Sequence, residues 1–286
     1  MIPILRSLSK STPFAFSKLT LMDSSSSSSG SKKLVALAQQ LRLYKATPTM
    51  RDLDEQILEE SFGKVVSQVG FAESATPIGQ QDPQSIRAHK THKKAAVLIC
   101  LFEGDNGDLR VILTKRSSNL STHSGEVALP GGKAEEGDKD DGDTATREAK
   151  EEIGLDPSLV NVVTSLEPFL SKHLLRVVPV IGILNEKKAF KPAPNPDEVE
   201  AVFDAPLEMF IKGENRRTEE SEWMGHKYLI HHFDYEMENK KYLIWGLTAG
   251  ILIRAASVVY KQPPAFLEQN PIFKVSRDTD KDIKMP

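Results

Sequence analysis

A glycine turn followed by a short acidic helix constrains the fold of this chain more than any other feature of its sequence. The turn is Gly131-Gly132, and the helical segment covers residues 147–155. Apolar side chains repeat four residues apart on one side of that helix: Ala145, Ala149 and Ile153. One helix face is therefore expected to be buried, and Gly154 supplies the stop at the C-terminal end.

The other face of this helix collects negative charge. Its glutamates lie at positions i, i+3 and i+4: Glu148, Glu151 and Glu152. Carboxylates one turn apart repel each other, whereas hard divalent cations such as Mg²⁺ bind oxygen ligands arranged in this way. Arg147 stands four residues before Glu151 and can orient that carboxylate. The pattern indicates a metal site, and a solvated helix of mixed charges is the commoner alternative.

The spacing of these residues resembles the signature of the Nudix hydrolases, Gly-x5-Glu-x7-Arg-Glu-apolar-x-Glu-Glu-x-Gly-apolar. The chain matches it from Gly132 to Leu155 with two departures: Asp138 replaces the first glutamate, and the spacer from Asp138 to Arg147 is one residue longer. The half that carries the metal ligands matches throughout. The resemblance implies an α/β fold, the Nudix-type α/β/α sandwich with a mixed sheet, and Mg²⁺ or Mn²⁺ as cofactor.

A second motif runs directly into the glycine pair. Residues 113–117 read Leu-Thr-Lys-Arg-Ser, and they are followed by Gly125 and by Leu-Pro-Gly-Gly at 129–132. This resembles the additional signature of the coenzyme A diphosphatase branch, Leu-Leu-Thr-x-Arg-Ser-x3-Arg-x3-Gly-x3-Phe-Pro-Gly-Gly. Three positions depart from it: Ile112, Ser121 and Leu129. Serine in place of the second arginine removes one phosphate contact.

The resemblance implies hydrolysis of a diphosphate bond in coenzyme A or its acyl derivatives, giving 3′,5′-ADP and 4′-phosphopantetheine. Metal ions would neutralise charge on the transferred phosphorus and orient a water for in-line attack. The expected metal ligands are Glu148, Glu151, Glu152 and the main-chain carbonyl of Gly131. The expected catalytic residues are Glu151, Glu148, Arg147 and Glu198. The expected substrate contacts are Arg116, Ser117, Gly125 and Lys133.

Two rival functions stay open at this point. The first is a Nudix enzyme acting on another diphosphate, such as a nucleotide sugar, a dinucleotide or an isoprenoid diphosphate, because Ser121 weakens the coenzyme A motif. The second is a non-catalytic module that binds a metal or ligand without turning it over, against which the three intact glutamates argue.

Glu198 is the candidate for an acidic residue from outside the signature, which in Nudix enzymes often joins the metal site. It follows a proline-rich stretch, 191–196, that cannot form a regular element. It precedes the apolar positions Val199, Val202 and Phe203. Glu200 is the reserve, and a surface helix start enriched in acids is the alternative.

Apolar runs and turn residues predict the remaining elements. Residues 95–102, 159–166 and 177–184 are expected to form buried strands, and 109–114 to return from 95–102 as a hairpin. A second hairpin is expected from 227–235 and 241–244. A helix over 245–261 should face the core with Leu247, Ile251, Ala255 and Val258. Arg216 and Arg217 fall in a polar turn, where they either contact phosphate or are solvated.

The composition fits one sizeable globular domain with additions: 286 residues, 39% of them hydrophobic and 27% charged. A net charge of −3 gives no general attraction to nucleic acid or anionic membrane. No apolar run reaches the ~18 residues of a membrane span. The expected partner is a small-molecule diphosphate, with no nucleic acid and no membrane. Cys100 is the only cysteine, so an internal disulfide is excluded.

The first 22 residues contain Arg6, Lys10 and Lys18, several serines and no acid. This composition predicts an organelle transit segment over 1–22, mitochondrial with plastid as the alternative. A start at Met22 would give a cytosolic product.

Residues 23–91 are expected to form a linker and helical extension, with a helix capped by Ser31 and another over 51–71. The extension could dock on the catalytic domain, mediate a homodimer contact or stay partly mobile. The catalytic domain is expected over 92–265 and a C-terminal tail over 266–286, which is charged from Ser276 onward.

Overall fold

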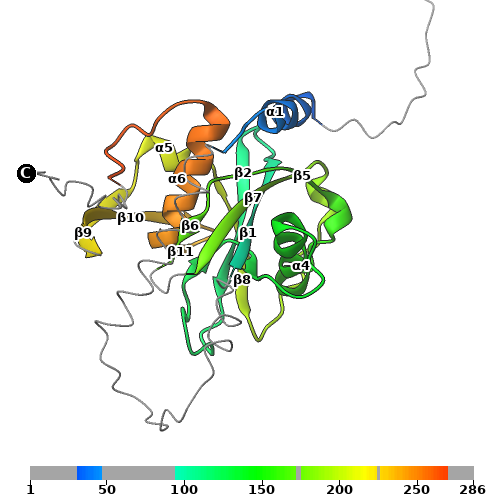
Figure 1. Cartoon of the computed structure of the whole chain (residues 1–286), viewed down its shortest axis with the longest axis horizontal. Coiled ribbons are helices and arrows are strands. Elements are labelled where there is room, and N and C mark those ends of the chain that lie inside the picture. The colour runs from blue at the N-terminus through cyan, green and yellow to red at the C-terminus, as the bar shows by residue number, and fades with distance from the viewer. Residues whose placement is uncertain (1–30, 47–93, 172–174, 224–225, 270–286) are drawn as a thin grey trace, which may run out of the picture.

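A mixed β-sheet forms the centre of the computed structural model, which describes residues 31–46, 94–171, 175–223 and 226–269 (Figure 1). The predicted segments 1–22 and 51–71 lie outside the described residues. The main path of the sheet runs in the order β3-β2-β1-β7-β5. Its strands are β3 (Val127–Ala128), β2 (Leu109–Arg116), β1 (Lys94–Glu103), β7 (Arg176–Leu184) and β5 (Val160–Ser165).

Three further strands extend this sheet. They are β4 (Gly131–Lys133) beside β1, β6 (Phe169–Leu170) beside β7, and β8 (Val199–Pro206) beside β2. β1 pairs antiparallel with β2 and parallel with β7, so the sheet is mixed. The predicted hairpin and the two further strands are thus confirmed, with bounds shifted by one or two residues. The short 3₁₀ helices are η1 (Pro157–Leu159) and η2 (Lys187–Ala189).

Alternate side chains of β1 enter two separate cores, because successive residues of a strand point to opposite faces of its sheet. On one face, Leu98 and Phe102 pack with Ala149 and Ile153 of helix α4 (Asp141–Ile153). On the other face, Leu101 packs in a core that includes helices α1 (Lys32–Arg42) and α6 (Gly246–Tyr260). The expected α/β/α sandwich is therefore confirmed.

Helix α4 begins and ends at residues suited to those positions. Asp140 caps its start by accepting a hydrogen bond from the Asp143 main-chain N–H at 2.9 Å. Gly154 ends it in the left-handed conformation with φ 71°, which glycine adopts without steric cost. The predicted acidic helix and its glycine stop are confirmed, and the helix starts six residues before Arg147.

Helix α1 docks on the same molecule. Ser31 caps it, and Leu34 and Leu41 are completely buried in the core shared with α6. The Gln40 side-chain amide donates to the Val259 carbonyl of α6 at 3.0 Å. Among the alternatives for the extension, docking on the catalytic domain is thus the outcome for this helix.

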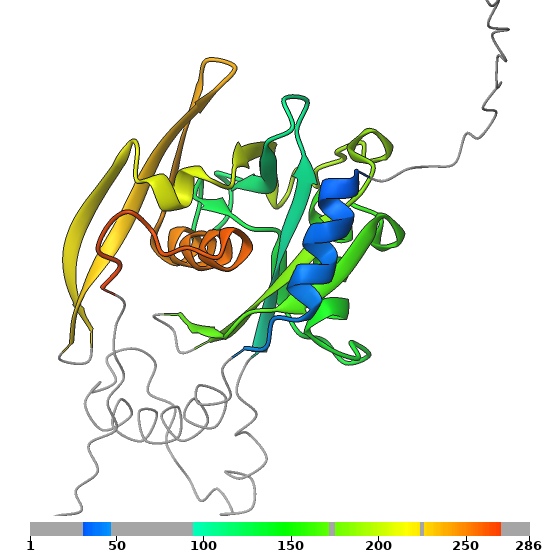
Figure 2. The same ribbon diagram turned by 90° about the horizontal axis from the view of Figure 1, so that it is seen from above.

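A separate three-stranded sheet lies on the far side of α6, so that α6 stands between the two sheets (Figure 2). It contains β9 (Arg216–Trp223), β10 (His226–Met237) and β11 (Lys240–Trp245), and helix α5 (Met209–Lys212) precedes it. The predicted second hairpin is confirmed as β10–β11, turning at Glu238 and Asn239, both with positive φ.

Three expectations about the second half of the chain are wrong. Arg216 and Arg217 begin strand β9 and are not in a turn. Residues 199–206 form a strand, so the helix-start alternative at Glu198 fails. Leu247 is exposed on the first turn of α6 instead of facing the core. Phe266, just after the expected end of the catalytic domain, packs against Phe233 and the Arg216 guanidinium.

None of the helices in the described residues has the length and apolar character of a membrane span.

Candidate active site

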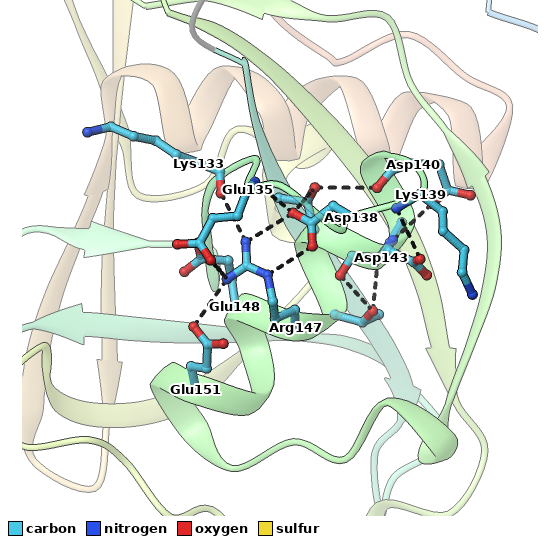
Figure 3. Close-up of polar contacts among 12 residues, drawn as sticks. Lys133, Glu135, Asp138, Lys139, Asp140, Asp143, Arg147, Glu148 and Glu151 are labelled. Carbon is cyan, nitrogen blue, oxygen red and sulfur yellow. Dashed lines mark hydrogen bonds and ion pairs between the residues drawn. The ribbon is translucent and has the colours of Figure 1, made fainter.

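The Arg147 guanidinium is the hub of the acidic cluster at the glycine turn (Figure 3). Its Nε and Nη2 donate to the two carboxylate oxygens of Asp138 at 3.0 and 3.1 Å. Its Nη1 donates to Glu148 at 3.3 Å and to Glu151 at 3.2 Å. Its Nη2 also donates to the Lys133 carbonyl at 3.0 Å. One planar side chain therefore fixes two of the three predicted ligand carboxylates and the end of β4.

Asp138 clamps this arginine to the start of α4. Besides the paired bonds from Arg147, it accepts hydrogen bonds from the Glu135 N–H at 3.0 Å and the Thr144 hydroxyl at 2.8 Å. The hydrogen bonds from Arg147 hold the pKa of Asp138 well below its usual range. Asp138 stands where the signature has the longer glutamate, and the spacer to Arg147 has one extra residue. Asp138 and Arg147 are nevertheless joined by two hydrogen bonds. Sequence reasoning missed this role, although the spacing from Asp138 to Arg147 could have signalled it.

Glu152 lies beneath the glycine turn, with only 5% of its side chain exposed. It accepts a hydrogen bond from the Gly131 N–H at 3.2 Å, and Arg116 Nη1 lies 3.8 Å from its other oxygen. Burial raises the pKa of Glu152 to about 7, against the opposing effects of Gly131 and Arg116. The alternative of a solvated, mixed-charge helix face is therefore wrong for Glu152.

The glycine pair lets the carboxylates approach the main chain. A side chain at position 132 would collide with the Glu148 carboxylate, and one at 131 would collide with the main chain of β1 at Ala96. Burial also raises the pKa of Glu148. Both glycines are thus required by close packing.

Glu198, in the turn just before β8, joins this group. Its carbonyl accepts from the Ser117 N–H at 2.8 Å, and its charge raises the pKa of both Glu148 and Glu152. Glu200, the reserve candidate, forms an exposed ion pair with Lys115 at 2.7 Å. The structure therefore brings Glu198 to the cluster and pairs Glu200 elsewhere.

The predicted substrate residues divide into two groups. Arg116 reaches Glu152, and its buried Nε lacks a hydrogen-bond partner among the described residues. Ser117 is buried beside it and holds Glu198 through the main chain. Gly125 lies in the loop before β3 with φ 69°, and the exposed Lys133 side chain points away from Arg147 (Figure 3). Arg116 and Ser117 thus adjoin the carboxylates, whereas the Lys133 side chain does not.

The charge of the carboxylate cluster suits a cation, but its side chains are not arranged around a single point. No three acidic, His or Cys side chains of the described ranges converge on one point as a ready-made metal site, since Glu148 and Glu151 bind Arg147. The raised pKa values of Glu148 and Glu152 nevertheless show buried negative charge that their hydrogen bonds do not fully compensate. A hard divalent cation with oxygen ligands would supply that compensation.

Comparison with known proteins agrees with this arrangement. The model of the NUDIX domain matches residues 92–245, more than half of the chain. The chain belongs to the Nudix hydrolase family. It is therefore a hydrolase of diphosphate bonds in small molecules, in a family that generally uses divalent metal ions.

Two plant relatives of this Nudix hydrolase are highly similar. "Nudix hydrolase 15, mitochondrial" of Arabidopsis thaliana is 76% identical over 216 residues, covering 76% of this chain and 74% of the relative. "Nudix hydrolase 22, chloroplastic" of the same plant is 65% identical over 252 residues, covering 87% and 80%.

Two more distant matches come from other organisms. "Peroxisomal coenzyme A diphosphatase NUDT7" of Mus musculus is 36% identical over 181 residues, covering 63% of this chain and 75% of the relative. A crystal structure of a Nudix hydrolase from M. smegmatis, RenU, is 22% identical with a TM-score of 0.35, covering 41% of this chain and 72% of that one.

Proposed function

We propose that this Nudix hydrolase cleaves the diphosphate bond of coenzyme A or its acyl derivatives, giving 3′,5′-ADP and 4′-phosphopantetheine or its acyl form. The observation that supports this most is the position of Arg116, the arginine of the coenzyme A motif. Its guanidinium lies 3.8 Å from Glu152, and its buried Nε is unpartnered among the described residues. The Arg116 side chain is 27% exposed, so its guanidinium can pair with a diphosphate oxygen. The mouse relative named as a coenzyme A diphosphatase supports the same substrate class.

The residues around Arg116 take the following roles in the proposal. Glu148, Glu151 and Glu152 would hold Mg²⁺ or Mn²⁺ together with the Gly131 carbonyl. When bound, the cation would supply neutralisation of the charge on the transferred phosphoryl group and would make a water more acidic. Arg147 orients Glu148 and Glu151, which it already binds. Ser117, Gly125 and Lys133 complete the substrate contacts.

A nearby carboxylate accepts the remaining proton of the attacking water. Glu151 suits this task because it is 58% exposed and stands one turn from Glu148 on the same helix face. Glu198 is the alternative base, since it lies close enough to Glu148 and Glu152 to raise their pKa values.

A panel of diphosphates tests the substrate. Protein from Met22 onward is offered coenzyme A, acetyl-coenzyme A, dephospho-coenzyme A, ADP-ribose, NADH and geranyl diphosphate, each with Mg²⁺ or Mn²⁺. We expect coenzyme A and acetyl-coenzyme A to be preferred. We expect Arg116→Ala to lower their kcat/KM by an amount that corresponds to about 1.5–3 kcal/mol of transition-state stabilisation, through loss of a charge-assisted contact. Lys115→Ala is the matched control, because Lys115 pairs with Glu200 at 2.7 Å.

Preferred cleavage of ADP-ribose, NADH or the isoprenoid would contradict the coenzyme A assignment and leave the Nudix chemistry standing. That second function stays a candidate because Ser121 replaces an arginine of the motif.

We also propose that residues 1–22 direct the protein to mitochondria. The segment carries three bases and no acid, and one plant relative is named mitochondrial while another is named chloroplastic. A fluorescent fusion of the full chain should reach mitochondria, and one starting at Met22 should stay cytosolic. Delivery of the full-length fusion to plastids, or identical cytosolic distribution of both, would contradict this.

A further inference from the structure

The proline-rich stretch 191–196 covers the C-terminal end of helix α4. Every second residue of this stretch is proline, which has no main-chain N–H to donate. The residues between the prolines donate to the helix instead: the Ala193 N–H to the Ile153 carbonyl and the Asn195 N–H to the Glu152 carbonyl, each at 2.9 Å. The last four carbonyls of an α-helix have no partner within the helix, and these bonds satisfy two of them. The stretch is thus docked on the helix that carries the acidic face.

Asn195 also holds the segment that leads into β8. Its carbonyl accepts hydrogen bonds from the Glu198 N–H at 3.1 Å and from the Val199 N–H at 2.8 Å. Its side-chain oxygen accepts from the Asp197 N–H at 3.2 Å. An asparagine side chain that binds the main chain two residues later closes a turn by itself. Asn195 therefore connects the main chain of Glu152 to that of Glu198 and fixes the turn between them.

Glu198 is held through its main chain. Asn195 binds its N–H, and its carbonyl accepts from the Ser117 N–H at 2.8 Å. Its half-buried carboxylate is close enough to repel the negative charges of Glu148 and Glu152. Within the described part of the chain, no hydrogen bond or ion pair holds this carboxylate. The place of the Glu198 carboxylate at the acidic cluster therefore depends on how its main chain is fixed.

We propose that Asn195 is a positioning residue for the hydrolysis, because it fixes the main chain of Glu198 relative to Glu152 and so keeps the Glu198 carboxylate at the acidic cluster. This inference rests on the proposed function, in which Glu198 is a candidate base. A glutamate side chain is long and flexible, and misplacing a reacting group by about 1 Å can cost about 10²-fold in rate. Asn195 acts on the reaction through Glu198.

The test is a double-mutant cycle on coenzyme A hydrolysis with Mg²⁺ in the full-length chain. Asn195→Ala removes the side-chain bond to Asp197 and should lower kcat about fivefold, with KM changed less than about twofold. Asn195→Asp keeps the acceptor oxygen and should stay within about twofold of the wild-type kcat. Glu198→Gln should lower kcat at least about tenfold. Adding Asn195→Ala to Glu198→Gln should then change kcat less than about twofold, since residues that act as a unit are not additive.

Amide hydrogen exchange gives a second readout that needs neither substrate nor metal. In Asn195→Ala, the amides of residues 195–199 should exchange on the order of fivefold faster, because the turn opens more often. Asn161→Ala is the matched control: it also removes one side-chain hydrogen bond, which Arg42 donates at 3.1 Å. It should keep the wild-type kcat and the wild-type exchange over 195–199.

An additive loss in the double variant, wild-type kcat in Asn195→Ala, or unchanged exchange over 195–199 would overturn the role of Asn195 while coenzyme A hydrolysis stands. Wild-type kcat in Glu198→Gln would overturn it too, because Asn195 would then have no group to act through. A wild-type protein that leaves coenzyme A uncleaved would overturn the proposed function instead, and the cycle then runs on the diphosphate that the protein does cleave.

Discussion

Glu151 and Glu152 are neighbours in the chain, yet the side chain of Glu151 is 58% exposed and that of Glu152 is 5% exposed. The helix turns one toward solvent and the other beneath Gly131. Burial raises the pKa of Glu152 to about 7, and nearby Glu148 and Glu198 add to the shift. The two residues therefore suit different tasks, a proton acceptor in contact with water and an inner ligand for a cation.

The stability of the metal-free protein should depend on pH through Glu152. Its folded-state pKa lies above the ordinary value of 4.5, so its contribution is fully present below about pH 4.5 and is lost as pH rises through about 7. We expect a loss on the order of 2–3 kcal/mol between pH 5 and 8, which Glu152→Gln abolishes. Mg²⁺ should raise Tm more at pH 8 than at pH 5. Thermal unfolding measures both effects, and parallel pH profiles for the two proteins would contradict them.

Asp138 should contribute to stability in the opposite pH range. Because its hydrogen bonds from Arg147 lower its pKa, its contribution is present at neutral pH and is lost as pH falls below about 4. Asp138→Asn should cost about 1–3 kcal/mol in urea unfolding at pH 7, since it weakens a buried charge-assisted pair. Glu135→Gln is the control, because Glu135 is exposed and lies 3.9 Å from Arg147. Equal effects of the two substitutions would show that the clamp adds no stability.

At the level of elements, α1 completes the catalytic domain although it precedes the matched region. Just after this helix, the Tyr44 hydroxyl donates to Glu167 at 2.6 Å, and Arg254 of α6 donates to the same carboxylate at 2.9 Å. These contacts lower the pKa of Glu167 to about 2, and burial with the Glu167 bond raises that of Tyr44 to about 12. The network ties α1 to α6 through the loop that follows β5.

Leu41→Ala should therefore destabilise the protein by about 2–5 kcal/mol, as expected for truncating a fully buried leucine. Leu43→Ala, two residues later and 82% exposed, should change stability by less than about 0.5 kcal/mol. Chemical denaturation of the protein from Met22 measures both. A small effect of Leu41→Ala would mean that α1 does not dock in solution.

Apolar periodicity predicted the helices and strands that bury one regular face. It did not predict strand β9, whose sequence is polar. Strand β9 has the sequence RRTEESEW, which lacks apolar alternation. It lies at the edge of its sheet and is held there by backbone pairing with β10. The glutamate spacing predicted one shared helix face, but the different burial of Glu151 and Glu152 depends on the glycine turn that covers one of them. Contacts between distant segments, such as Arg116 with Glu152, have no local signal in the sequence.

At the scale of the whole molecule, helix α6, which follows the matched domain, contacts strand β3 just before the glycine turn. Helix α6 lies between the two sheets (Figure 2), and its Thr248 hydroxyl donates to the Val127 carbonyl of β3 at 3.2 Å. Val127 lies between Glu126 and the residues that lead to the glycine turn. The C-terminal helix thus supports the loop that carries the proposed substrate contacts.

The rate of coenzyme A hydrolysis with Mg²⁺ tests whether the acidic face of α4 carries the chemistry. The measurement follows formation of 3′,5′-ADP by chromatography for wild type, Glu151→Gln and Glu152→Gln. Lys150→Gln, an exposed neighbour, is the control. We predict a fall in kcat of about 10²-fold or more for both glutamate variants with cooperative unfolding retained, because each loses a group that stabilises charge in the transition state. Wild-type turnover in either variant would contradict it.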